Sequence, residues 1–462
     1  MTQTVELPLW LFLLIVVFAA VTLASHFLFP SVRWFFRRRL ERAVARLNTR
    51  LQRPIQPFKL ARRYDMIQRL IYDPQVTHAA QQYARETGIP EGVAFEQARG
   101  YAREIVPSFS AVAYFSIAIR LARKLSNAFY DVRLSYEDEN AVQQIDPEAT
   151  VVFVMNHRSN MDYVLVTYLA AQQSALSYAV GEWARVWPLS RLIRAMGAYF
   201  IRRKSGSEFY RHVLSCYVRH ATEAGVTQAM FPEGGLSLTG ATGRPKLGLL
   251  KYIMDGTTPD GRDVVFVPVA LNYDRVLEDT ILTHAALGAD RRFHARIGVI
   301  TGWIIKQIWR RLIGRYKRFG QASVRYGMPI SLQDFRSQPR EDDMTELARE
   351  LMLRITRAIP LVPVPAICFL LRARRSMSVK DVRSNVHKMM QKAGRPSDDD
   401  FRPIDAAIEQ LVARDILKQQ GETLAVSGHR SDLLDYYAAS APAWVQAIDI
   451  AGAEDNSASA GS

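Results

Sequence analysis

The stretch VVFVMNHRSNMDYVL, residues 151–165, places a histidine and an aspartate between two apolar segments. Residues 151–155 predict a buried strand and residues 163–171 a helix, so His157 should lie in the loop at the carboxyl end of the strand. Four residues separate His157 from Asp162, which can fold back from the start of the helix to accept the imidazole N–H. The carboxylate would then set the tautomer, and the other ring nitrogen would be free to take a proton from a hydroxyl group.

The pair alone also admits a second interpretation. His157 could cap the end of the strand, and Asp162 could lie in the first turn of the helix, where a carboxylate suits the helix dipole. The chain has no Gly-x-Ser-x-Gly motif, so we expect no acyl intermediate on a serine of the protein. If the pair is catalytic, the alcohol of a substrate is the nucleophile.

Three further stretches place charged residues or turns beside expected strands. GAYFIRR ends in Arg202 and Arg203, and arginine grips phosphate through two parallel hydrogen bonds. MFPEGG ends in a glycine turn whose backbone N–H groups could face an anion. Its Glu233 could hold a substrate hydroxyl, orient an arginine, or be a plain turn carboxylate. VPVALNYDRV begins at Val267 with a proline inside an apolar run, which favours an edge strand, a bulge or a strand start.

Alternating strand-like and helical segments must position these residues. The expected strands are residues 151–155, 177–180, 198–201, 227–231, 264–271 and 322–326. Helical stretches such as residues 208–223 and 247–254 lie between them. This alternation predicts an α/β domain with a mainly parallel central sheet, in which ligand groups collect at the carboxyl ends of the strands.

The N-terminus indicates a membrane protein. Residues 7–29 carry no Lys, Arg, Asp or Glu and are long enough to span a bilayer as a helix. Basic residues are absent from residues 1–6 and cluster from about residue 31, so we predict an uncleaved transmembrane anchor that leaves the rest of the chain in the cytoplasm. A cleaved signal peptide or a buried core helix is the alternative.

Charge and composition indicate which partners the protein could have and which kinds of site are excluded. The formal net charge of +15 indicates a partner with phosphates, either nucleic acid or an anionic membrane. Basic residues interleave with aromatic ones in residues 31–63 and 302–318, and the first of these stretches adjoins the anchor, which favours lipid headgroups over nucleic acid. Residues 108–130 predict an interfacial or core helix. The two cysteines are far apart and predict neither a disulfide framework nor a thiolate metal site.

These features divide the chain into five predicted regions. They are a transmembrane anchor at 1–30, a basic juxtamembrane and helical region at 31–130, the α/β domain at 131–335, a C-terminal helical domain at 336–450 and a disordered tail at 451–462.

Together and in this order, the four stretches resemble the motifs of the glycerolipid acyltransferase family. His157 and Asp162 match its first motif, a histidine, four residues and an aspartate. Residues 197–203 match Gly-x-x-Phe-Ile-Arg-Arg, Glu233 begins the Glu-Gly-Gly motif, and Pro268 matches the proline-containing strand. The resemblance covers about residues 100–335. It implies an α/β acyltransferase domain and transfer of a fatty acyl group from coenzyme A or acyl carrier protein to a glycerol phosphate.

The first motif, HRSNMDY, resembles the glycerol-3-phosphate acyltransferase branch, and the C-terminal LLDYYAAS resembles the long bacterial-type form of that branch, which has helical regions on both sides of the catalytic domain. One departure concerns the residues after Glu-Gly-Gly. The branch usually has Arg-Ser-Arg there, whereas this chain has leucines on both sides of Ser237. Arg244 and Lys246 could supply the missing charge. Asn156 and FPEG resemble the lysophosphatidate branch, so the acceptor is less certain than the reaction.

The resemblance implies a mechanism in which His157, held by Asp162, deprotonates the C1 hydroxyl of glycerol 3-phosphate. It implies substrate-binding roles for Arg158, Ser159, Arg202, Arg203, Glu233, Gly234, Gly235, Ser237, Arg244, Lys246 and Pro268. No cofactor or metal is expected beyond the acyl-CoA or acyl-ACP substrate. The expected partners are membrane lipids, the acyl carrier and glycerol 3-phosphate, with no nucleic acid, at the bacterial inner membrane. The alternatives are a 1-acylglycerol-3-phosphate acyltransferase and a non-catalytic protein that binds the membrane surface.

Overall fold

A computed structural model describes residues 8–17, 38–39, 41–169, 174–181, 189–202, 207–258, 260–288, 318–394 and 400–445. The chain divides into two compact units, Met1–Ile55 and Gln56–Ser462. Residues 9–17 and 41–48 of the first unit are helical. Residues 18–29 of the predicted anchor, most of the basic segment that follows it, and residues 302–317 fall outside the described part of the chain.

Among the described residues, no single helix is both long and apolar enough to cross a bilayer. One pair, α15 (Asp343–Ala358) and α16 (Pro363–Arg374), meets the length and composition criteria together, but the two helices are bent by 91°.

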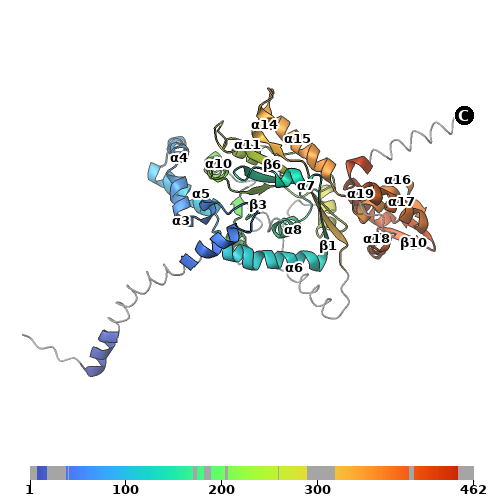
Figure 1. The fold of residues 1–462 in the computed structure, drawn as a ribbon, viewed down its shortest axis with the longest axis horizontal. Coiled ribbons are helices and arrows are strands. Elements are labelled where there is room, and N and C mark those ends of the chain that lie inside the picture. The colour runs from blue at the N-terminus through green and yellow to red at the C-terminus, as the bar shows by residue number, and fades with distance from the viewer. Residues whose placement is uncertain are drawn as a thin grey trace, which may run out of the picture. The chain divides into compact units, whose positions relative to one another are not determined.

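A mainly parallel sheet forms the centre of the second unit (Figure 1). Its strand order is β1 (Asp131–Tyr136), β7 (Gln321–Tyr326), β6 (Val264–Tyr273), β2 (Thr150–Met155), β5 (Gln228–Met230), β3 (Ser177–Gly181) and β4 (Tyr199–Ile201). Strands β6, β2, β5, β3 and β4 are parallel to one another, as the sequence predicts. All six predicted strands are present, with small differences at their ends.

The remaining strands were not predicted. β1 pairs with β7 in parallel, and β7 runs antiparallel to β6. The residues of β1 are half-buried or exposed, because the strand lies at the edge of the sheet, so its sequence lacks the apolar run that marks the interior strands. The two-residue strand β8 (Ile330–Ser331) pairs antiparallel with the first half of β6.

Pro268 lies in the interior of the sheet, which corrects the expectation of an edge strand or strand start. It pairs in register with Val154 of the neighbouring strand β2. On the other side of β6, β8 pairs only as far as Phe266 and β7 begins at Val269. The proline therefore falls at the break between two antiparallel neighbours, where its missing N–H costs no ladder hydrogen bond on that side.

Both faces of the sheet are covered, which explains why β2 and β6 are apolar throughout. Val152 and Val154 of β2 belong to one apolar cluster, while Val151 and Phe153 belong to the other. The first cluster includes α3 (Arg63–Ile71), α4 (Pro74–Thr87), α5 (Glu91–Ile105), α10 (Glu208–Glu223), α11 (Gly248–Met254) and α15. The second includes α8 (Met161–Leu169), α12 (Asp279–Ala286) and the C-terminal helices.

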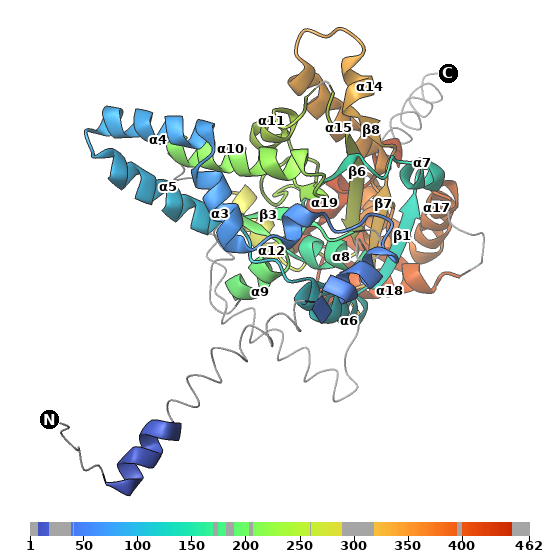
Figure 2. The same ribbon diagram turned by 60° about the vertical axis from the view of Figure 1, so that its left-hand side comes forward.

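The other helices are short or peripheral. α4 and α5 lie side by side against α10 (Figure 2). The predicted helix at 108–130 begins as a π-helix at Ala113–Ala118 and continues as α6 (Ile119–Phe129), which packs on α8 and β1. The remaining elements are α2 (Pro57–Leu60), α7 (Glu139–Gln143), α9 (Leu189–Ala195) and α14 (Leu332–Arg336).

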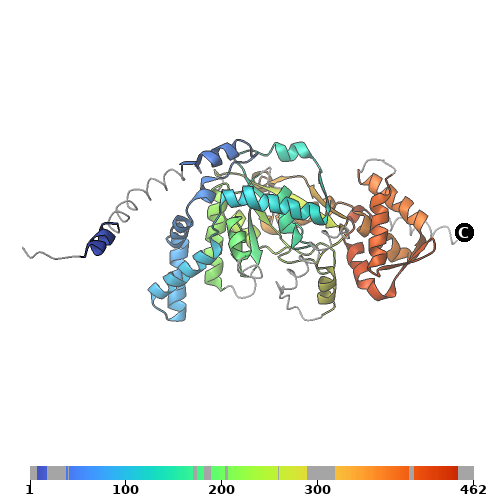
Figure 3. The same cartoon turned by 90° about the horizontal axis from the view of Figure 1, so that it is seen from below.

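The C-terminal region, for which a helical domain is predicted, contains helices and a small sheet. It contains α16, α17 (Val379–Lys392), α18 (Arg402–Ala413) and α19 (Ser431–Ala439), grouped together in Figure 3. A small antiparallel sheet of β9 (Ser376–Ser378), β10 (Leu417–Gln420) and β11 (Thr423–Val426) joins them. α15 packs on β6, and α16 and α19 share the apolar cluster of the central sheet, so residues 336–445 are not a separate core.

Candidate active site

The site begins where β2 ends. The Asn156 side chain takes the place of a further ladder pair, because its Nδ2 donates to the backbone oxygen of Leu271 at 3.0 Å and its Oδ1 accepts from the Leu271 N–H at 2.7 Å. This bidentate contact with β6 stops the strand and sets the direction in which the following loop leaves the sheet.

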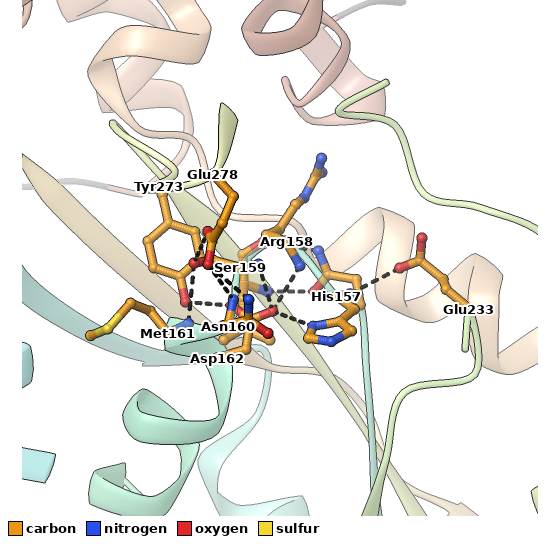
Figure 4. A network of polar contacts seen from close by, with 11 residues as sticks. His157, Arg158, Ser159, Asn160, Met161, Asp162, Glu233, Tyr273 and Glu278 are labelled. Carbon is orange, nitrogen blue, oxygen red and sulfur yellow. Dashed lines mark hydrogen bonds and ion pairs between the residues drawn. The ribbon is translucent and has the colours of Figure 1, made fainter. Parts of the chain in front are cut away.

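His157 and Asp162 meet in that loop (Figure 4). Nδ1 of His157 lies 2.8 Å from Oδ2 of Asp162, and both side chains are almost fully buried. The same carboxylate oxygen accepts the backbone N–H groups of Arg158 at 2.7 Å and Ser159 at 3.0 Å. Asp162 lies in the first turn of α8 and thus holds the loop and the imidazole together.

A tyrosine hydroxyl and two aromatic rings complete this arrangement, and nothing in the sequence indicated these contacts. The hydroxyl of Tyr273, at the end of β6, donates to Oδ1 of Asp162 at 2.5 Å. Burial raises the pKa of Tyr273, and the neighbouring Asp162 carboxylate raises it further. The imidazole of His157 stacks on Phe231 with ring centroids 4.1 Å apart, and Tyr163 presents its ring edge-on at 5.4 Å. The ring therefore has one orientation, with Nδ1 on the carboxylate.

Glu278 holds the middle of the loop. Its carboxylate accepts from the Ser159 hydroxyl at 2.7 Å and from the backbone and side-chain nitrogens of Asn160 at 3.2 and 3.0 Å. Burial raises the pKa of Glu278, although the hydrogen bonds from Ser159 and Asn160 act in the opposite direction. The sequence offered one signal for Glu278: it is an acidic residue just beyond the carboxyl end of a strand, where the ligand groups of a parallel sheet collect.

The C-terminal region fastens the segment that carries Glu278. Oδ2 of the next residue, Asp279, is 2.6 Å from a guanidinium nitrogen of Arg414, and it also accepts a hydrogen bond from the Tyr437 hydroxyl. That hydroxyl accepts in turn from the backbone N–H of Val276 at 3.1 Å. Arg414, in the turn after α18, and Tyr437 of α19 thus hold the residue next to Glu278, which contacts the His157 loop.

Glu233 and its turn contact the loop from β5. One carboxylate oxygen of Glu233 accepts the backbone N–H of His157 at 3.0 Å, and the other accepts that of Gly243 at 2.8 Å. Burial raises the pKa of Glu233. The backbone N–H of Ser237 donates to the His157 oxygen at 2.9 Å. Glu233 and Ser237 therefore act on His157 through its backbone.

Gly234 and Gly235 lie in the same turn, both half-buried. Gly234 has a φ of +66°, and a Cβ there would lie 2.7 Å from the Lys246 side chain. A glycine is thus needed for both the backbone conformation and the close passage of Lys246. Lys246 and Arg244 are otherwise exposed at the rim of this turn.

Arg158 is the buried cation of the site. Its side chain is 2% exposed, and none of its three guanidinium nitrogens has a hydrogen-bond partner within the part of the chain that the structure describes. Burial lowers the pKa of Arg158, while Tyr436, Glu233 and Asp162 act in the opposite direction. The guanidinium points away from the His157 ring in Figure 4.

The other predicted phosphate ligands lie differently. Arg202 is engaged by Glu104 of α5 through two hydrogen bonds of 3.0 and 2.8 Å, and its guanidinium lies over the rings of Tyr101 and Tyr210. Arg203 falls outside the described residues. Pro268 is buried in β6, so its contribution is to the shape of the sheet beneath the site.

The arrangement is suited to proton transfer. A carboxylate on Nδ1 places the exchangeable proton there and leaves the lone pair of Nε2 for a hydroxyl group. A small apolar cavity of about 10 Å³ lies beyond the two rings that contact His157, Phe231 and Tyr163, and gives the imidazole an apolar flank.

Two family models match the chain, and each covers part of it. Residues 133–272 match the family described as Acyltransferase, and residues 302–439 match the glycerol-3-phosphate acyltransferase C-terminal region. Proteins named glycerol-3-phosphate acyltransferase from Shewanella sp. (strain ANA-3) and Shewanella baltica (strain OS155) are 31% identical over 329 residues, which make up 70% of this chain and 39% of each relative. The chain therefore spans about two fifths of the length of these relatives.

One solved structure is also similar, the 1-acyl-sn-glycerophosphate (LPA) acyltransferase from Thermotoga maritima. The alignment covers 60% of this chain and 92% of that protein at 16% identity, with a TM-score of 0.32. The two family matches and the Shewanella relatives lead to one conclusion: the chain carries an Acyltransferase domain and a glycerol-3-phosphate acyltransferase C-terminal region, and it is similar to proteins named glycerol-3-phosphate acyltransferase.

Proposed function

We propose that this protein transfers a fatty acyl group from acyl-CoA or acyl-ACP to the C1 hydroxyl of glycerol 3-phosphate and releases lysophosphatidate. The observation that carries the proposal is the 2.8 Å contact between His157 and Asp162, buried at the carboxyl end of a central strand. The names of the relatives support the choice of acceptor.

In the proposed reaction, Nε2 of His157 takes the proton of the C1 hydroxyl as the oxygen attacks the thioester carbonyl. The C–O bond forms, the C–S bond breaks, and the proton passes from His157 to the departing thiolate. Asp162 keeps the imidazole in the reactive tautomer and stabilises the imidazolium that forms transiently. The hydrogen bonds from Tyr273, Arg158 and Ser159 to Asp162 hold this carboxylate in place throughout.

The loop around the pair provides positioning. Glu278 holds Ser159 and Asn160, while Glu233 and Ser237 hold the backbone of His157. A general base that is fixed on several sides loses little entropy when the acceptor hydroxyl arrives. The predicted anchor and basic stretches would keep the site at the membrane, where the acyl product can leave.

Thiol release from an acyl thioester in the presence of glycerol 3-phosphate tests the proposal. Replacing His157 by Ala should lower kcat by about two to four orders of magnitude, because the general base is lost. The exposed His212, on α10, provides the matched control, and His212→Ala should keep full turnover. Turnover by His157→Ala equal to that of the control would remove the mechanism, whereas no thiol release by the wild type would favour a non-catalytic protein that binds the membrane surface.

The acceptor is tested separately. Leu236 and Leu238 flank Ser237 where arginines are expected for glycerol 3-phosphate, so lysophosphatidate is the second candidate acceptor. Both acceptors should be compared in one assay, with acyl-CoA and acyl-ACP as alternative donors. A kcat/KM for lysophosphatidate above that for glycerol 3-phosphate would assign the protein to the second acylation step.

A further inference from the structure

Arg158 poses an energetic problem that the proposed mechanism does not answer. A guanidinium carries five N–H donors in a planar fork, and burial without partners costs several kcal/mol. Here the side chain is 2% exposed, and its three nitrogens have no acceptor among the described residues. The nearby carboxylates are already engaged, since Asp162 receives the imidazole, two backbone N–H groups and Tyr273, and both oxygens of Glu233 receive backbone N–H groups.

Tyr436 shares this condition. It belongs to α19, nearly three hundred residues along the chain, is 2% exposed, and has a hydroxyl without a hydrogen-bond partner in the described ranges. Arg158 and Tyr436 interact electrostatically. Tyr436 works to raise the pKa of Arg158, and Arg158 works to lower the pKa of Tyr436. Two unsatisfied donor groups from distant parts of the chain thus lie within electrostatic range of each other.

The backbone of Tyr436 is held at this position. Its carbonyl oxygen would be 1.9 Å from a Cβ at Gly240, whose φ is +82°, so only glycine permits the approach. Gly240 lies just past the Glu233 turn, which contacts His157. The close packing of α19 on this segment therefore requires a glycine at position 240.

We propose that Arg158 and Tyr436 together bind the phosphate of the acceptor, so that the C-terminal region forms part of the substrate site. This inference rests on the proposed function. A phosphate would satisfy the guanidinium fork with parallel hydrogen bonds and accept one more from the phenol, and a buried cation attracts an anion more strongly than an exposed one. Arg202, the sequence candidate, is engaged by Glu104, and Arg244 and Lys246 are exposed.

The direction of the side chain agrees with this role. In glycerol 3-phosphate the C1 hydroxyl and the phosphate are at opposite ends of a three-carbon chain, so the phosphate ligand must lie away from the imidazole. Arg158 follows His157 in the sequence, and its guanidinium points away from the ring (Figure 4). Because both groups are buried, α19 is expected to shift slightly as the phosphate enters between them.

The test uses the full chain in membranes, one acyl-CoA, and two acceptors, glycerol 3-phosphate and glycerol. Arg158→Met should raise the KM for glycerol 3-phosphate by about 10- to 100-fold and Tyr436→Phe by about 3- to 10-fold, as expected for charged and neutral hydrogen bonds. Arg158→Lys should fall between wild type and Arg158→Met. The KM for acyl-CoA should stay within about twofold, and the preference for glycerol 3-phosphate over glycerol should fall in parallel.

Matched controls are Arg85→Met and Tyr72→Phe, both at exposed positions on the helical region. A second measurement covers loss of folding: glycerol 3-phosphate should raise the Tm of the wild type and the controls, and should raise that of Tyr436→Phe less. Unchanged acceptor preference in both Arg158→Met and Tyr436→Phe would overturn the proposal. An equal rise of the KM for glycerol 3-phosphate and the KM for acyl-CoA would also overturn it.

Failure of the proposed function is distinguishable from failure of this site. If the wild type acylates lysophosphatidate instead, the same variants are tested with lysophosphatidate against monoacylglycerol, which lacks the phosphate. A loss of phosphate preference in that pair supports the site although the acceptor differs. If no acceptor is turned over, the Tm shift with glycerol 3-phosphate decides: a shift that is reduced in Tyr436→Phe supports the site, and an unreduced shift overturns it.

Discussion

At the residue scale, Asp162 receives hydrogen bonds from the imidazole, two backbone N–H groups and a phenol, so both of its oxygens are engaged. These donors come from three sources: the His157 ring, the loop backbone and the end of β6. The carboxylate is therefore fixed in place, as the proposed orientation of the His157 imidazole requires. Tyr273 is the only one of these donors that can be removed without touching the catalytic loop.

We predict that Tyr273→Phe lowers kcat by about tenfold, the equivalent of about one hydrogen bond, with little change in either KM. The free energy of unfolding should fall by about 1–3 kcal/mol, because Oδ1 of Asp162 stays buried without this donor. Steady-state kinetics and chemical denaturation measure the two effects. Tyr130 is the control: its hydroxyl donates to the Arg275 backbone oxygen at 2.7 Å, so Tyr130→Phe should lose stability but keep kcat. Equal losses of kcat would show that Tyr273 acts only through packing.

Glu278 gives a prediction about pH. Burial raises its pKa above the ordinary carboxyl range, so the native state binds more protons at this site than the unfolded state does. Its contribution to the free energy of unfolding is therefore greatest at low pH and is lost as the pH rises through the raised pKa. In Glu278→Gln this slope should be absent, so the stability of the variant relative to wild type should increase with pH. Denaturant titrations at a series of pH values measure the difference, and a difference that does not vary with pH would contradict the raised pKa.

At the element scale, three strand ends and one distant helix make the site. β2 supplies the loop of His157, β5 the turn of Glu233, and β6 the segment that carries Tyr273 and Glu278. α19 packs against α16 and α12 and contacts the turn after β5 through Gly240. The C-terminal helices are therefore structural parts of the acyltransferase site, and their docking should control its activity.

Gly240→Ala tests this docking. The added methyl would overlap the Tyr436 backbone and impose strain at a φ of +82°, so we predict a loss of about 3 kcal/mol or more in unfolding free energy and a fall in kcat/KM. Gly421 is the matched control, because its φ is +59° but nothing lies within 4 Å of an added Cβ. Gly421→Ala should cost only about 1–2 kcal/mol and leave kcat/KM unchanged. Similar effects of the two variants on kcat/KM would contradict a role for α19 at the site.

At the scale of the whole molecule, Met1–Ile55 and Gln56–Ser462 are separate compact units, whereas the second unit has apolar clusters that run from its sheet into its C-terminal helices. Ile367 and Leu371 of α16 are fully buried in the same cluster as Phe153 of β2. Removal of the C-terminal region would expose the remaining members of this apolar cluster to solvent, and large exposed apolar patches promote aggregation.

Truncations should therefore differ sharply. We predict that residues 56–462 fold, melt cooperatively and keep acyl transfer in detergent, while sedimenting with membranes much less than the full chain, because the predicted anchor is gone. Residues 1–375 should aggregate, because α16 loses the helices that cover it. Circular dichroism melts and membrane flotation distinguish the two. Equal flotation of residues 56–462 and the full chain would show that the first 55 residues do not provide the main attachment.

The sequence by itself determined the main strands of the sheet and pointed to the residues of the candidate site. Order and spacing of short motifs identified His157, Asp162 and the Glu233 turn, and apolar runs identified six strands, because strand burial and local loop chemistry are written in neighbouring residues. Tyr273, Glu278 and Tyr436 were not predicted, and neither was the engagement of Arg202 by Glu104. Those contacts join residues more than ninety positions apart, so only the tertiary structure decided which polar groups meet and which, like the Arg158 guanidinium, are buried without a hydrogen-bond partner among the described residues.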